Sequence, residues 1–202
     1  MTTSLLQVPT AYIDRMVDSL VLAFSADPAA RWLYPDAQQY LKHFPEFVRA
    51  FGGKAFEAGT AHSIGDYAGA ALWLAPEVHS ETYPEVNPDD QALDALLQKT
   101  VTPDLQMVNA VFEQMRQYHP KEPHWYLAVL GVEPAQQHRG YGSALLKPVL
   151  AQCDRDRQLA YLESSNPANI PFYERHGFQL IGRTQQDTSP ALFPMVRHPQ
   201  SI

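Results

Sequence analysis

The sequence predicts an α/β (α+β) protein of one domain, in which helices pack on a sheet. In its second half, apolar runs of strand length at residues 124–132 and 159–164 alternate with segments of helical periodicity. In its first half, two amphipathic helical patterns precede a pair of short strands. Such alternation is typical of helices layered on a sheet. The 202 residues, 45% of them apolar, are enough for one sizeable core.

The first helices are predicted from apolar side chains at helical spacing. They cover residues 12–24, with Thr10 as the expected N-cap, and residues 37–56, where Pro45 predicts a break or kink. The other elements are an antiparallel hairpin at residues 60–65 and 69–74, helices beginning at Asn87 and after Thr102, Pro103 and Asp104, strands at 124–132, 159–164 and 178–182, a helix at 171–176, and a closing strand at 191–197. Gly131 predicts a bulge or a close backbone approach.

A glycine-containing loop at residues 137–143 lies between the strand at 124–132 and a helix. That helix is predicted from an apolar side made of Leu145, Leu146, Val149, Leu150 and Cys153. Backbone N–H groups at a helix start lack intrahelical partners, and aligned peptide dipoles add positive potential there. Gly140 and Gly142 have no Cβ, so an anion can approach the backbone. We therefore expect an anion site, with a pyrophosphate as its natural guest.

The loop differs from two other phosphate loops. A Rossmann fingerprint needs a third glycine, and a P-loop needs Lys followed by Ser or Thr; both are absent. Taken alone, a strand-to-helix turn without a ligand remains an alternative interpretation. Within the helix that follows, Pro148 predicts a kink or an early break.

Charge and cysteine content exclude some function classes. The net charge of −7 argues against a nucleic-acid surface and suits a cationic small substrate. The acidic residues between Glu77 and Asp94 are either solvated helix faces or a rim that attracts an amine. The single Cys153 cannot form an internal disulfide or a cysteine-rich metal site, and its place on the apolar side predicts a core residue. Without a visible targeting or membrane-spanning segment, we expect a soluble, cytoplasmic protein.

Two motifs together carry a resemblance to a known family. The runs HWYLAVLGVEPAQQHRGYGSALL and AYLESSNPANIPFYERHGF resemble the GNAT superfamily of acyl-CoA-dependent N-acyltransferases. In motif pattern they are closest to the puromycin N-acetyltransferase-like proteins, over residues 120–183. The resemblance implies a mixed, mostly antiparallel sheet whose central strands splay apart to hold CoA. It also implies one domain with an acceptor side at 1–119, an acetyl-CoA-binding core at 120–183 and a closing strand at 184–202.

The resemblance also implies roles for individual residues. Tyr173 is the expected general acid and Glu163 the expected base, acting directly or through water; His124, Tyr126 or no base at all remain open. The residues expected to bind the CoA part are Leu130, Val132, Gln137, His138, Arg139, Gly140, Tyr141, Gly142, Ser143, Asn166 and Asn169. Among them, the backbone N–H of Leu130 is the candidate oxyanion donor.

The function that this resemblance implies is acetyl-CoA-dependent N-acetylation of a primary amine of a small molecule, by direct attack on the thioester. Acetyl-CoA is the expected co-substrate, with no metal, no nucleic acid and no membrane partner. Two alternatives stay open: a non-catalytic acyl-CoA-binding sensor or interaction module, and an acetyltransferase for protein or peptide amines. A homodimer also stays open.

Overall fold

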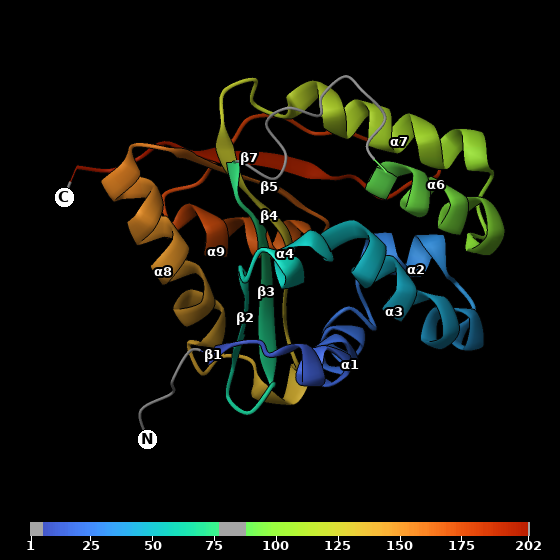
Figure 1. Ribbon diagram of the computed structural model, residues 1–202. Coiled ribbons are helices and arrows are strands. Elements are labelled where there is room, and N and C mark those ends of the chain that lie inside the picture. The colour runs from blue at the N-terminus through green and yellow to red at the C-terminus, as the bar shows by residue number, and fades with distance from the viewer. Residues whose placement is uncertain (1–5, 77–87, 202) are drawn as a thin grey trace.

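A seven-stranded sheet forms the centre of the protein, seen in a computed structural model that describes residues 6–76 and 88–201 (Figure 1). Its strands, in spatial order, are β1 (Leu6–Gln7), β2 (Ala61–Ile64), β3 (Gly69–Leu74), β4 (His124–Val132), β5 (Leu159–Ser164), β7 (Phe193–Arg197) and β6 (Gln179–Leu180). Only the central β4–β5 pair is parallel. The expected mixed, mostly antiparallel sheet is therefore confirmed, although β7 lies inside the sheet and β6 forms its edge.

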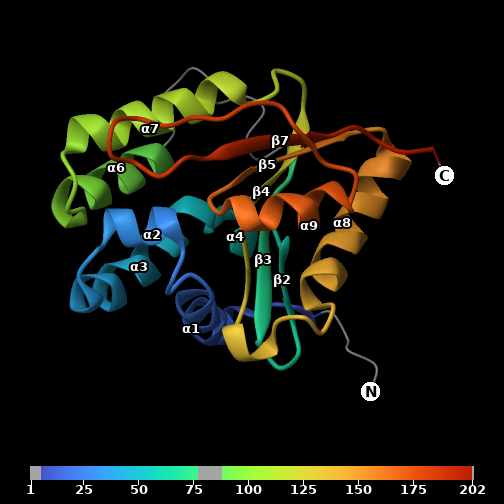
Figure 2. The same cartoon turned by 180° about the vertical axis from the view of Figure 1, so that it is seen from behind.

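Helices cover both faces of this sheet (Figures 1 and 2). One face carries α8 (Tyr141–Asp156) and α9 (Ile170–Glu174). The other carries helices from the first half of the chain: α1 (Ile13–Ala23), α2 (Pro28–Leu33), α3 (Ala37–Gly52), α4 (Lys54–Glu57), α6 (Pro88–Thr100) and α7 (Leu105–Tyr118). None of the described helices is both long and apolar enough to cross a membrane.

Successive side chains of each strand point to opposite faces of the sheet, so the strands contribute to two separate hydrophobic clusters. On β3, Ala70 and Leu72 belong to the cluster under α1 and α3, whereas Ala71 and Trp73 belong to the cluster under α8. All of β3 is buried, which is the pattern expected of a strand covered on both faces. Cys153 lies in the second cluster, and burial raises the pKa of its thiol to about 12, as suits a core residue.

The two central strands pair over three residues only, a third of the nine residues of β4 and half of the six of β5. His124–Tyr126 of β4 pairs with Leu159–Tyr161 of β5, and no pairing continues towards Val132 and Ser164. Just beyond the last pair, β4 has an extra residue: Leu72 pairs with Val129 but Trp73 pairs with Leu127, so Ala128 is left as a bulge. Bulges increase the local twist of a strand, and this one turns β4 away from β5.

Gly131 does not carry the bulge predicted for it, but the close approach predicted as the alternative is present. A Cβ at this position would lie 2.8 Å from Ala23 and 2.9 Å from Leu20, both on α1. The helix therefore packs directly on the β4 backbone. The bulge falls at Ala128 instead, which nothing in the local sequence marks.

Two prolines lie inside continuous helices, against the predicted breaks. Pro45 is inside α3 and Pro148 inside α8, and both helices run on to their ends. In α3, the rings of Phe44, Phe47 and Phe51 stack in sequence along the buried side. This packing holds both halves of the helix on the core, which offsets the roughly 3 kcal/mol that an interior proline costs.

Two predicted helix starts have different outcomes. Thr10 is not the N-cap of α1, because Thr10–Tyr12 forms a short 3-10 turn and Tyr12 occupies the cap position without a side-chain hydrogen bond. The helix predicted after Thr102, Pro103 and Asp104 is present as α7. Its cap is Asp104, whose carboxylate accepts from the N–H groups of Gln106 and Met107. The cap predicted at Asn87, like the acidic residues Glu77, Glu81 and Glu85, lies outside the described residues.

A buried ion pair attaches β7 to α8. The guanidinium of Arg197 donates two hydrogen bonds of 2.8 Å to the Asp154 carboxylate and one of 2.9 Å to the carbonyl of His176. These bonds lower the pKa of Asp154 below its ordinary value of 3.8. A depressed pKa in the folded state means that this contribution to stability is present above pH 3.8 and is lost as the pH falls through the folded-state pKa.

We expect Asp154→Asn to lower the free energy of unfolding at pH 7 by about 1–3 kcal/mol, because a charge-assisted bond to a buried guanidinium is replaced by a neutral one. The difference from the parent protein should shrink as the pH is lowered below 3.8. Urea unfolding at several pH values measures this, with the exposed Asp156→Asn on the same helix as control. A difference that stays constant from pH 7 to pH 3 would contradict the assignment.

Candidate active site

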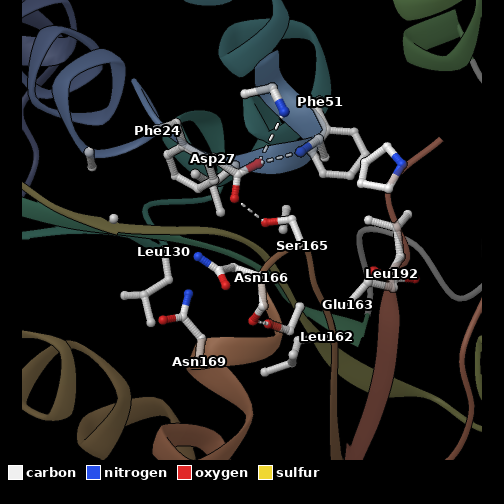
Figure 3. A pocket seen from close by; sticks show the side chains of 18 of the residues that line it. Phe24, Asp27, Phe51, Leu130, Leu162, Glu163, Ser165, Asn166, Asn169 and Leu192 are labelled. Atoms are coloured by element: carbon white, nitrogen blue, oxygen red, sulfur yellow. Dashed lines mark hydrogen bonds between the residues drawn. The ribbon is translucent and has the colours of Figure 1, made fainter. Parts of the chain in front are cut away.

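A cavity of about 660 Å³ lies where β4 and β5 separate. Because the sheet is open there, side chains from both faces reach the same space. Tyr173 belongs to the cluster under α8, whereas Phe44 and Val48 belong to the cluster under α3, and all three line the cavity. Figure 3 shows Asp27 and Phe24 on one side of this space and Leu130 and Asn169 on another.

The hydrogen-bonding pattern of β4 directs backbone groups into the opening. The N–H of Glu133 donates to Ala68 at 2.9 Å, so in this antiparallel register Gly131 pairs with β3 through its backbone. The residues between these pairs, Leu130 and Val132, then turn their N–H and C=O groups away from β3, towards the side where β5 has separated. The carbonyl of Val132 accepts from the Gln137 side-chain amide at 3.2 Å.

The loop at residues 137–143 leads directly into α8, as predicted. Gly140 is the N-cap with φ of +80°, and His138 has φ of +61°, so the loop alternates into the left-handed region. No side chain caps the helix and no acidic residue lies in its first turn. The N–H groups of the first turn can therefore bind an anion without competition from a carboxylate.

The predicted CoA-binding residues divide into two groups. Those that line the cavity are Leu130, Gln137, His138, Asn166 and Asn169. The others lie beside it: Arg139 and Gly140 are exposed, Ser143 is in the first turn of α8, and the Tyr141 ring packs against Gly65. A Cβ on Gly142 would lie 3.0 Å from the Phe172 ring, so this glycine lets α8 and α9 approach each other.

The segment after β5 is ordered by local hydrogen bonds. The Ser164 hydroxyl donates to the carbonyl of Asn166 at 2.9 Å, and the Asn166 side chain accepts from the N–H of Ala168. This cap starts the short 3-10 helix η3 (Pro167–Asn169), which continues into α9. The Tyr173 ring packs edge-on against Phe172 and Phe178.

Tyr173 is a protonated phenol at neutral pH. It is 8% exposed, and burial followed by the nearby Asp27 charge raises its pKa well above the ordinary value of 10. A phenol in this state donates a proton rather than accepting one. It lines the cavity on the side of α9, across the sheet from the helices of the first half.

Glu163 lies at the cavity wall with both oxygens engaged. One oxygen accepts from the Tyr126 hydroxyl at 2.9 Å, and the other lies 3.1 Å from Nε2 of His119, the C-cap of α7. The side chains of Glu163 and His119 are only 4% and 7% exposed. Tyr161 and His124 surround His119, and burial lowers the pKa of His124, so that its imidazole is neutral at pH 7.

Comparison with known proteins finds similarity to acetyltransferases. Residues 107–178, which include β4, the loop, α8, β5 and α9, match the acetyltransferase (GNAT) family model. An N-acetyltransferase of fission yeast, described as uncharacterized, is 28% identical over 198 residues, covering 91% of this chain and 78% of its own. Over residues 107–178, about a third of the chain, the protein is similar to the GNAT acetyltransferases. The prediction of an enzyme, an N-acetyltransferase, is confirmed.

Solved structures share the GNAT fold over the full chain. A Corynebacterium glutamicum protein, described as histone acetyltransferase HPA2 and related acetyltransferase, is 24% identical with a TM-score of 0.63, covering 100% of this chain and 99% of its own. Arylalkylamine N-acetyltransferase 2 of Aedes aegypti is 12% identical with a TM-score of 0.61, covering 99% and 100%. At these identities the likeness concerns the fold. The narrower resemblance to puromycin N-acetyltransferase-like proteins is not confirmed.

Asp27 is a site residue that sequence reasoning missed. Its carboxylate caps α2, accepting from the N–H groups of Ala29 and Ala30 at 3.0 Å. The Ser165 hydroxyl donates to its other oxygen at 2.5 Å. Burial raises the pKa of Asp27 above its ordinary value, although these hydrogen bonds oppose the shift. An Asp before a proline was a cap signal in the sequence, but only the fold brings Ser165 to it.

An aromatic wall is the second feature missed by sequence reasoning. It consists of cavity-lining rings from α1, α2, α3 and α7: Phe24, Trp32, Phe44, Phe47, Phe51 and Phe112. The sequence predicted helices on the acceptor side, but helical periodicity does not separate the core from a cavity wall. Among the described residues no group of acids, histidines or cysteines is arranged to hold a metal ion.

We expect the Glu163–His119 pair to appear as a coupling energy in a double-mutant cycle. Glu163→Gln and His119→Gln should each lower the free energy of unfolding by about 3 kcal/mol, because each leaves a buried polar partner without its counterpart. The double variant should lose at least about 1 kcal/mol less than the sum. Guanidinium unfolding of the four proteins measures this. Additive losses would show that the two side chains do not interact.

Proposed function

We propose that this protein is an acetyl-CoA-dependent N-acetyltransferase that transfers an acetyl group to a primary amine of a small molecule. The observation that carries the proposal is the cavity between β4 and β5. At one end it meets the anion-binding loop, and it is lined by the Tyr173 phenol and by the carboxylates of Glu163 and Asp27. The amine named for the Aedes aegypti neighbour supports an amine acceptor.

The residues present fit the donor substrate. The pyrophosphate of acetyl-CoA would bind the N–H groups at the start of α8, where the exposed Arg139 adds a charge-assisted contact. The pantetheine arm would follow β4 and pair with the outward-facing backbone groups of Leu130 and Val132, in the place of a missing strand. Asn166 and Asn169 would contact the arm from the segment after β5.

The chemistry then needs one bond formed and one broken. The neutral amine attacks the thioester carbonyl carbon, and the C–N bond forms while negative charge gathers on the carbonyl oxygen. The Leu130 N–H is aimed to stabilise that oxyanion. When the C–S bond breaks, the Tyr173 phenol gives its proton to the leaving thiolate. Glu163 takes the proton released from the amine nitrogen, directly or through water.

The direct test is release of CoA thiol from acetyl-CoA in the presence of primary amines, aminonucleosides, aminoglycosides and peptides. We expect thiol release with small amines and little with peptides. Binding of acetyl-CoA without turnover on any amine would favour the sensor alternative. Preferential turnover on a peptide N-terminus or lysine would favour a protein substrate.

We expect Tyr173→Phe to lower kcat by about 10²-fold or more, the usual contribution of general acid catalysis, because the leaving thiolate loses its proton donor. The Kd for acetyl-CoA, measured by calorimetry, should stay within about twofold, since the ring remains in place. Tyr12→Phe, which lies at an exposed position, is the matched control. Unchanged kcat in Tyr173→Phe would remove this residue from the mechanism.

A negative charge added at the start of α8 should change helix stability and CoA binding in opposite directions. Ser143→Asp places a carboxylate in the first turn of α8, which stabilises the helix through its dipole by up to about 1 kcal/mol but repels a pyrophosphate. We expect the Tm to be unchanged or higher, and the Kd for CoA to rise about 10-fold or more. Ser143→Asn is the neutral control. If Ser143→Asp binds CoA as tightly as the control, the diphosphate lies elsewhere.

A further inference from the structure

Asp27 differs from Glu163 in its hydrogen-bonding partners. Glu163 has a histidine at 3.1 Å and a tyrosine hydroxyl as partners. Asp27 has only neutral donors: two backbone N–H groups and the Ser165 hydroxyl. No lysine or arginine is among the described residues that line the cavity. Asp27 is therefore a carboxylate of the cavity that can attract a cation.

The position of Asp27 is next to the chemistry. Asp27 and Tyr173 line the same cavity, and the negative charge of Asp27 adds to burial in raising the pKa of the Tyr173 phenol. Figure 3 shows the Asp27 carboxylate and the Ser165 hydroxyl joined beside Asn166, with Leu130 nearby. An ammonium bound to Asp27 is thereby held beside the residues proposed to contact the thioester.

The rest of this side of the cavity is apolar. Along α3 the rings of Phe44, Phe47 and Phe51 stack with centroids 5.8 and 5.4 Å apart, and the Phe24 ring lies 5.6 Å from Phe44. Phe112 of α7 meets Phe51 edge-on at 6.3 Å. A hydrocarbon or ring placed here is desolvated favourably, whereas a second charged group would lose its hydration without a counter-charge.

We propose that the acceptor is a primary amine with a single positive charge and an apolar, ring-bearing body. Its ammonium binds Asp27 and Ser165 and gives one proton to the Asp27 carboxylate, so that the neutral amine attacks. Its body lies on the aromatic wall of α3. Polyamines and guanidinoamines are disfavoured because their second cation falls on that wall. This inference rests on the proposed acetyl transfer and names the substrate class of the same site.

The experiment compares 2-phenylethylamine, 2-cyclohexylethylamine, agmatine and spermidine as acceptors, by kcat/KM from thiol release. We expect the two monoamines to exceed agmatine and spermidine by at least about 10-fold, a difference of roughly 1.4 kcal/mol in transition-state binding. A preference for agmatine or spermidine would overturn the proposal.

Asp27→Asn tests whether the Asp27 carboxylate binds the ammonium, without removing the N-cap of α2. Asparagine still offers an oxygen to the N–H groups of Ala29 and Ala30, and it is as good an N-cap as aspartate. We expect KM for 2-phenylethylamine to rise about 10- to 100-fold, with the Kd for acetyl-CoA unchanged. Asp36→Asn, which makes the same exchange at the exposed cap of α3, is the matched control. An unchanged KM would overturn the role of Asp27.

Phe47→Glu tests whether the body of the acceptor lies on the aromatic wall. The glutamate supplies a negative charge for the second cation of a guanidinoamine such as agmatine. Phe47 is only partly buried, and Phe47→Leu serves as the apolar control. We expect the glutamate to shift the kcat/KM ratio of agmatine to 2-phenylethylamine upward by about 10-fold or more, while leucine leaves it nearly unchanged. An equal ratio in both variants would show that the acceptor body does not contact this wall.

Calorimetry of 2-phenylethylamine with the CoA-bound protein separates this inference from the proposed function. If binding depends on Asp27 but no amine is acetylated, the acceptor site stands and the catalytic proposal fails. If amines are acetylated but 2-phenylethylamine binds equally well to the parent protein and to Asp27→Asn, the catalytic proposal stands and this assignment fails.

Discussion

The separation of β4 from β5 is the constraint on which the rest of the structure depends. Three residue pairs hold the strands together at one end, and the bulge at Ala128 turns β4 away after the last of them. A continuous sheet would keep its two faces apart, and Tyr173 would then lie behind the sheet from Glu163. The opening instead lets groups from both faces share one cavity, and it leaves a length of β4 backbone whose polar groups need a partner.

The two ends of this cavity have complementary electrostatics. The start of α8 offers unpaired N–H groups and an αL glycine, which suit a diphosphate. The opposite side presents Asp27 and rings from α3, which suit a cation with an apolar body. The thioester of a bound acyl-CoA would lie between them, beside a phenol that burial keeps protonated. The protein's part in catalysis is then mainly to position reactants and to supply one proton.

The sequence allowed the prediction of what is local. Periodicity and turn chemistry predicted the strand–loop–helix unit around Gly140, the hairpin before β4, and the helix after Thr102, Pro103 and Asp104. The bulge at Ala128 and the continuity of α3 through Pro45 could not be predicted from the sequence, because tertiary packing decides both. Asp27 and Ser165 are 138 positions apart and meet only in the fold. The resemblance placed the acceptor side at residues 1–119, but it did not identify the rings of the aromatic wall, because burial patterns are alike for a filled interior and a cavity lining.

A crystal structure with CoA bound tests the central claim most directly. The account predicts the diphosphate on the N–H groups of residues 140–143, the pantetheine arm paired with the backbone of Leu130 and Val132, and the sulfur within hydrogen-bonding distance of the Tyr173 hydroxyl. A nucleotide bound outside the opening between β4 and β5, or a Tyr173 hydroxyl turned away from the sulfur, would contradict it.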